Sequence, residues 1–295
     1  MRIRLILFLL IAPALVQAQQ KVDIRRAAIP TVSVRLAGAI SQVRILGWDR
    51  DSVTITGSLG TGSRIDGGAV TSGSGGPAQG IKFYVDAPDD GSSRSNLLEL
   101  RVPRGARVWI KSGSAQVDAS GVTGGLDLNI VGGSVTVRGE PRELIVESMD
   151  GGVTFTGRAQ FARLKTATGD ITVDGGGEDV SLSTVSGVLR AAGGVVERGR
   201  FESVTGPINF AGDLARGGDV RLDTHSGAIE VRLARGAAVE MDAQSVTGGI
   251  ENSWTTARPA VGREGRGMEL GTSSGMGGAR VSIRSFKGNV RLATR

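Results

Sequence analysis

The segment ARLKTATGDITV (residues 162–173) is followed 18 residues later by VSLSTVSGVLRA (residues 180–191), and the two share one pattern. In each segment, polar and apolar residues alternate on both sides of a short turn that ends in glycine, at Gly169 and Gly187. Alternation with a period of two is typical of a β-strand that has one buried and one solvent-facing side. Each unit is therefore predicted to be a strand, a tight turn, a second strand and a return loop.

The same unit recurs along most of the chain. Its turn position is Ala115 in the first unit and then Gly133, Gly151, Gly169, Gly187, Gly206, Gly227, Gly248 and Gly288. Two residues after the turn every unit has an aliphatic residue: Val117, Val135, Val153, Ile171, Leu189, Ile208, Ile229, Ile250 and Val290. Five residues before the turn the column is also apolar: Ile110, Leu128, Val146, Leu164, Leu182, Phe201, Leu222, Ala243 and Ile283. Stacking such units buries these columns in one continuous core, so the repeat predicts an all-β, single-domain β-solenoid with 18–21 residues per rung, stacked in sequence order.

A third column lies three residues before the turn and carries hydroxyl groups in eight of nine units: Ser112, Ser148, Thr166, Thr184, Ser203, Thr224, Ser245 and Ser285, with Ile130 as the exception. A ladder of hydroxyls could bind a ligand. The structural interpretation is favoured, because a hydroxyl at an inward corner can bond the turn amides or its neighbours in the stack.

The remaining segments divide the chain. Residues 1–18 are predicted to be a signal peptide, residues 19–107 irregular β rungs, and residues 108–295 the regular solenoid. Residues 57–80 are rich in Gly and Ser and are expected to form a mobile loop within the irregular part. Residues 253–278 are an insertion that is expected to take the place of one rung.

The chain start has the features of a secretory leader. Arg2 and Arg4 precede an apolar run, Leu5 to Leu15, and Ala18 completes a small-x-small cleavage pattern. The run is shorter than the roughly 20 residues of a membrane-spanning helix, so no integral span is expected in the mature chain.

The formal charge is +6, or +4 without the two leader arginines, and the basic residues are scattered rather than clustered. This pattern does not favour nucleic-acid binding. The chain has no cysteine and hence no disulfides.

Residues suited to catalysis are sparse. The nearest carboxylate pairs are Glu230 with Glu251 and Glu202 with Asp223, each expected one rung apart, and solvated surface acids are the favoured interpretation. His225 is the single histidine and lies in a turn, and no nucleophile elbow accompanies it. The segment 174–179 (DGGGED) has the composition of a calcium turn but occurs only once. We therefore expect no catalytic residues, no metal site and no cofactor.

The insertion contains the candidate recognition residues. Trp254, Arg258, Arg263 and Arg266 lie on an irregular excursion, and aromatic and arginine side chains are common at binding surfaces. The alternative is that Trp254 closes the end of the solenoid.

The segment 43–57 (VRILGWDRDSVTITG) resembles the opening of a bacterial family of β-strand-repeat domains that is labelled putative adhesin and is otherwise catalogued as a domain of unknown function. The segment 100–106 (LRVPRGA), the serial Ser/Thr-x-x-Gly-x-aliphatic units and the segment 278–283 (GARVSI) are similar to that family too. The resemblance covers nearly the whole mature chain. It implies a β-helix-like fold and an envelope or surface location, and it supplies no binding residues.

Together these features predict an exported, non-enzymatic interaction module of the cell envelope or surface, periplasmic or extracellular, with a glycan or an envelope or surface protein as partner. Two alternatives remain open: an envelope-stress accessory protein that senses lipid or cationic peptide, and a polysaccharide-active β-helix enzyme.

Overall fold

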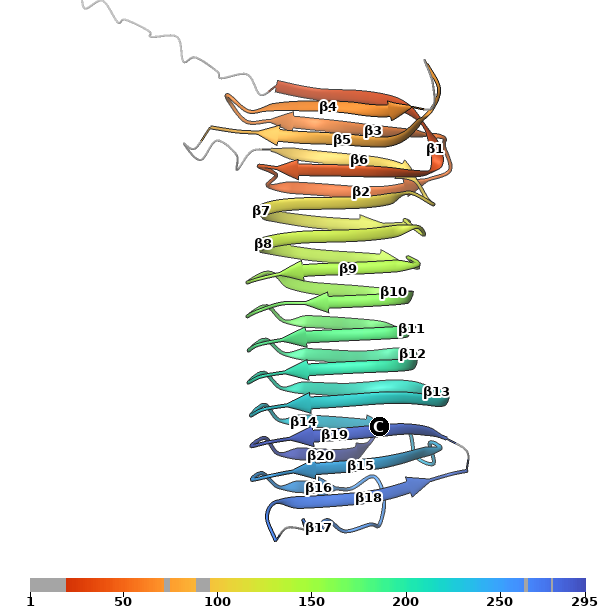
Figure 1. Ribbon diagram of the computed structural model, residues 1–295, viewed down its shortest axis with the longest axis vertical. Coiled ribbons are helices and arrows are strands. Elements are labelled where there is room, and N and C mark those ends of the chain that lie inside the picture. The colour runs from red at the N-terminus through yellow and green to blue at the C-terminus, as the bar shows by residue number, and fades with distance from the viewer. Residues whose placement is uncertain (1–19, 72–74, 89–95, 263–264, 277) are drawn as a thin grey trace, which may run out of the picture.

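The computed structural model describes residues 20–71, 75–88, 96–262, 265–276 and 278–295. The predicted signal peptide and Arg263 lie outside these residues. The described chain is all-β, and its strands form one mixed sheet wound into an elongated solenoid (Figure 1). No helix in this part of the chain is long and apolar enough to cross a membrane.

The strands alternate between two sides of the solenoid, and several of them continue around a corner. In chain order they are β1 (Gln20–Gly38), β2 (Gln42–Trp48), β3 (Ser52–Leu59), β4 (Arg64–Thr71), β5 (Ala78–Asp86), β6 (Leu97–Pro103), β7 (Arg107–Ser120), β8 (Gly125–Gly139), β9 (Glu143–Ser148), β10 (Gly152–Lys165), β11 (Ile171–Thr184), β12 (Leu189–Ser203), β13 (Ile208–Thr224), β14 (Ile229–Leu233), β15 (Val239–Ser245), β16 (Ile250–Asn252), β17 (Ala260–Val261), β18 (Met268–Ser274), β19 (Ala279–Ser285) and β20 (Val290–Thr294). We call the side formed by the segments before the glycine turns the front sheet, and the side formed by the segments after them the back sheet.

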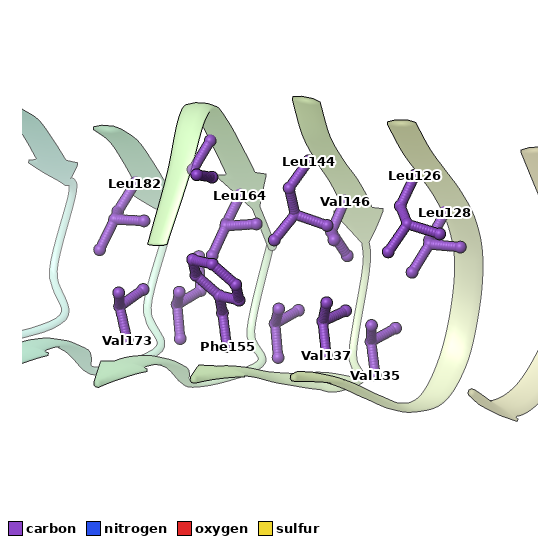
Figure 2. Packing of buried hydrophobic residues seen from close by; sticks show 14 of the residues in the cluster. Leu126, Leu128, Val135, Val137, Leu144, Val146, Phe155, Leu164, Val173 and Leu182 are labelled. Carbon is purple, nitrogen blue, oxygen red and sulfur yellow. The ribbon is translucent and has the colours of Figure 1, made fainter. Parts of the chain in front are cut away.

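The core lies between the two sheets, as the repeat predicts. All members of both apolar columns are buried. Figure 2 shows Val146, Leu164 and Leu182 of the front sheet pointing toward Val137, Phe155 and Val173 of the back sheet. Because parallel neighbours are in register, members of each apolar column lie beside one another in neighbouring rungs; Ile171, for example, pairs with Val153 and Leu189.

The order of the rungs differs from the sequence order at the C-terminal end. β19 pairs in parallel with both β13 and β15, and β20 pairs with both β14 and β16. The last rung of the chain is therefore inserted between the two rungs that precede it, and Figure 1 shows the C-terminus inside the stack. The turns follow one another as Gly227, Gly288 and Gly248, which corrects the predicted sequential order.

The N-terminal end is interleaved in the same way. The second half of β1 pairs in parallel with β5 and β7, and β2 pairs with β6 and β7. The regular stack thus extends beyond its expected start at residue 108, because this early rung lies in register between later ones.

Antiparallel strands cover both ends of the solenoid. β4 pairs with β5, β3 with β6 and the first half of β1 with β3 at one end, and β18 pairs with β15 and with β17 at the other. A hairpin reverses direction within a few residues and so can add a closing strand to an edge that would otherwise stay open. β4 corrects the expectation of a loop over residues 57–80, and β18 occupies the end position within the insertion.

Glycine stands at the repeated turns because neighbouring turns are closely stacked, and backbone conformation is the reason at few of them. Among the repeated turn glycines only Gly133 has a φ in the left-handed region, at 107°. At Gly187 an added Cβ would lie 2.1 Å from the carbonyl oxygen of Gly169 in the next rung, and at Gly206 it would lie 1.9 Å from that of Gly187. Glycine is therefore required because the backbones of successive turns nearly touch.

Gly187→Ala is expected to destabilise the protein by about 1–3 kcal/mol, since the rungs must separate to admit the methyl group. Gly152→Ala is the matched control, because its Cβ would meet no atom closer than 3.7 Å and its effect should stay within about 0.5 kcal/mol. Urea denaturation followed by circular dichroism measures both variants. Equal midpoints for the two would contradict the close-stacking explanation.

Candidate functional site

One long corner of the solenoid carries an exposed apolar row. The row consists of the residues two before each of the eight glycine turns, and in stacking order these are Val131, Met149, Ala167, Val185, Val204, His225, Phe286 and Val246. We call it the edge row. Val185 is 50% exposed and Met149 55%, although both lie directly beside buried positions of the strand. Alternation explains the exposure, because the residue between the edge row and the next outward row points into the core.

The inward residues beneath this corner are the hydroxyl column, and they serve the turns. Ser148 Oγ accepts a hydrogen bond from the Gly151 amide at 3.0 Å, and Thr224 Oγ1 accepts one from the Gly227 amide at 2.9 Å. Thr166 Oγ1 donates to Gly169 O at 2.6 Å and lies 3.0 Å from Thr184 Oγ1. All eight hydroxyl residues are buried, and six of them make hydrogen bonds, as the structural interpretation predicts; Ser203 Oγ and Ser285 Oγ have no hydrogen-bond partner in the described part of the chain.

The second outward row, four residues before each turn, is polar and of mixed charge. In stacking order it contains Lys111, Asn129, Glu147, Lys165, Ser183, Glu202, Asp223, Arg284 and Gln244, and we call it the polar row. Partial burial raises the pKa of Asp223, Arg284 opposes this rise, and the neighbouring Glu202 adds to it. Glu202 is itself paired with Arg200 at 2.6 Å.

The edge row and the polar row enclose a trough along the solenoid axis. A hollow of about 360 Å³ runs from Lys111 to Val185, and a second of about 520 Å³ runs from Ser183 to Val246. The hollows meet at the rung of Ser183 and Val185 and together follow the corner over most of the stack. Sequence reasoning missed this trough, because it used the inward columns and treated the outward ones only as polar surface.

The interleaved last rung completes the second hollow. The imidazole of His225 stacks on the Phe286 ring, with centroids 5.1 Å apart and planes 15° apart. Because the two residues belong to distant parts of the chain, the sequence placed His225 only in a turn and gave no sign of this contact.

The candidate recognition residues of the insertion lie at the C-terminal end of the solenoid. Trp254 is half-buried against the core, and its indole Nε1 donates to Ala234 O at 3.3 Å. Asn252 Oδ1 accepts from the amides of Trp254 and Thr255. Arg258 and Arg266 are exposed. The structure therefore places Trp254 against the core beside Ala234, and recognition by Trp254, Arg258 and Arg266 stays a prediction.

Of the two expected carboxylate pairs, the structure brings one together and separates the other. Glu202 and Asp223 are register partners on adjacent strands. Glu230 and Glu251 are not neighbours, because both pair with Arg291 of the inserted rung, which lies between them. No group of three or more metal-ligating side chains occurs among the residues that the structure describes.

A family described as Toastrack DUF4097 matches residues 41–293. The comparison with curated proteins gave no match. Among solved structures, one named a putative cell adhesion protein from Clostridium sporogenes is 9% identical, with a TM-score of 0.28 over 94% of this chain and 100% of that chain. A similarity this low carries no argument about function.

Proposed function

Because the chain belongs to the Toastrack DUF4097 family, which is defined without a function, we propose a function from its surface: it is an exported, non-catalytic interaction module of the cell envelope or cell surface. The observation that carries this proposal is the trough of two successive hollows along the solenoid corner. An open trough offers contact area along its whole length to an extended partner, whereas a small molecule is usually bound in a more enclosed pocket.

The rigidity of the stack supports the same function. The rungs are held by parallel pairing between neighbouring strands, and the C-terminus lies inside the stack, where Arg295 donates to Ala211 O at 3.1 Å and pairs with Asp213. Residues on neighbouring rungs therefore keep fixed spacing, which lowers the entropic cost of binding a long partner.

Export is tested by fractionating bacteria that produce the full chain or a variant lacking residues 2–18. Antiserum is preferable to a C-terminal tag, because the terminal residue is bonded within the stack. We expect the full chain in the periplasmic or surface fraction, shortened by the leader, and the variant in the cytoplasm. Cytoplasmic retention of both proteins would contradict the proposal. Incubation with a polysaccharide panel should release no reducing ends; release would contradict the non-catalytic part.

A further inference from the structure

We propose that the trough binds a neutral, unbranched glycan that lies along the solenoid axis between the edge row and the polar row. This inference rests on the proposed function and specifies its ligand class and site. Four features of the trough point to this class of polymer.

The first feature is the floor, which leaves no backbone groups for a partner strand. The amides of Val185, Val204 and Phe286 donate to carbonyls of adjacent rungs, at Ala167 O, Thr184 O and Thr224 O. A protein that binds by adding a strand needs free backbone donors and acceptors at the edge it joins. The hydrogen-bonded floor of the trough is therefore unsuited to an added β-strand.

The second feature is the mixed charge of the polar row. Glu147 lies beside Lys165 and one rung from Asn129, and Glu202 and Asp223 are followed by Arg284. A polyanion would meet the carboxylates along its length, and a polycation would meet the ammonium and guanidinium groups. Like charges brought together at an interface cost free energy, so the row favours a polymer without charge.

The third feature is the opposition of a polar and an apolar wall. An acyl chain against the edge row would also cover the charged side chains opposite, and removing these from water without a partner is costly. A pyranose ring has both kinds of surface: its C–H groups suit Val185, Val204 and Phe286, and its hydroxyls can bond Asp223 and Gln244. Carboxylates and amides are good partners for hydroxyl groups.

The fourth feature is the spacing. Successive rungs are about 4.8 Å apart, since they are neighbours in a sheet. One sugar in an extended β-1,4-linked chain advances by a similar distance, so each sugar, turned relative to the one before it, would lie against one rung. An extended peptide advances by about 3.3 Å per residue and does not keep this register.

Titration calorimetry of the leader-less protein with cellohexaose, N-acetylchitohexaose and laminarihexaose tests the proposal. We expect at least one hexasaccharide to bind, and Val185→Arg, which fills the trough where the two hollows meet, to weaken that binding about tenfold or more. Asp223→Asn, which removes an acceptor and keeps the shape, should weaken it severalfold. Val195→Arg is the matched control, because Val195 is 41% exposed and lies outside the residues that line the trough.

Thermal melting of each variant confirms that it is folded. Absence of binding by the wild-type protein to all three sugars, or equal binding by Val185→Arg and the wild type, would overturn the glycan site. A wild-type dimer that Val185→Arg converts to a monomer, without sugar binding, would show instead that the edge row joins two copies. These outcomes leave surface location intact, so they are distinguishable from failure of the proposed function, which the fractionation result decides.

Discussion

Removing residues 279–295 is expected to unfold far more than one rung. These residues form β19 and β20, which lie between β13–β14 on one side and β15–β16 on the other. Burial of the side chains Val281, Ile283, Val290 and Leu292 stabilises the wild-type protein by about 1.5–3 kcal/mol each, and the truncation removes this free energy. The loss also exposes both neighbouring rungs, and it leaves residues 234–278 without their parallel partner.

Limited proteolysis with mass spectrometry measures this effect. The truncated chain should be cut rapidly between residues 234 and 278, whereas the stack up to β12 should stay resistant, because rungs depend mainly on their immediate neighbours. Arg291→Ala, at an exposed position of the same rung, is the control and should keep the wild-type pattern. Resistance of residues 239–278 in the truncated chain would show that the last rung is only a terminal addition.

Ile171→Asp is expected to destabilise the protein by about 4 kcal/mol or more, in the range that marks an uncompensated buried charge. Ile171 is fully buried between Val153 and Leu189, and no polar partner lies in its column. Thr172→Asp is the control: its side chain faces outward beside Arg190, so its effect should be within about 0.5 kcal/mol.

The pH dependence of the stability of Ile171→Asp distinguishes the cost of burying a charge from the cost of disturbed packing. Burial raises the pKa of an aspartate in the folded state above its unfolded value of about 3.9, so the folded state binds the proton more tightly. Stability relative to the wild type is therefore best at low pH and falls as the pH rises above that unfolded value. Denaturation midpoints at pH 4 and pH 7 should show the smaller deficit at pH 4. A deficit that does not change with pH would assign the loss to packing alone.

Sequence patterns predicted the rung but not the order of the rungs. The inward columns, the glycine turns and the role of the hydroxyls followed from alternation, which is a local property. The order Gly227, Gly288, Gly248 did not, because every rung carries a similar apolar column and each order satisfies the same pattern. The interleaved order buries the first and last rungs of the chain inside the stack. Antiparallel hairpins then cover the strand edges that remain at the two ends.

Two other differences have similar causes. Residues 64–71 form a strand although nearly all of them are exposed, so no burial pattern marked them; pairing with β5 holds them instead. The edge row was visible in the sequence, but its significance depends on the trough that it forms with the polar row, and the contact of His225 with Phe286 depends on the rung order.

The order of the rungs is the central claim, because the second hollow of the trough exists only if β19 lies beside β13. The chain has no cysteine, so engineered pairs report this order without background. Arg221 and Ser282 are register partners, as are Ser282 and Asp242, whereas Arg221 and Asp242 are separated by a strand. A disulfide needs Cα atoms about 4.4–6.8 Å apart, a condition that adjacent strands meet and strands two positions apart do not. After mild oxidation and peptide mass spectrometry, Arg221→Cys with Ser282→Cys should form a crosslink, and Arg221→Cys with Asp242→Cys should remain reduced. The reverse result would contradict the interleaved solenoid and restore the sequential order.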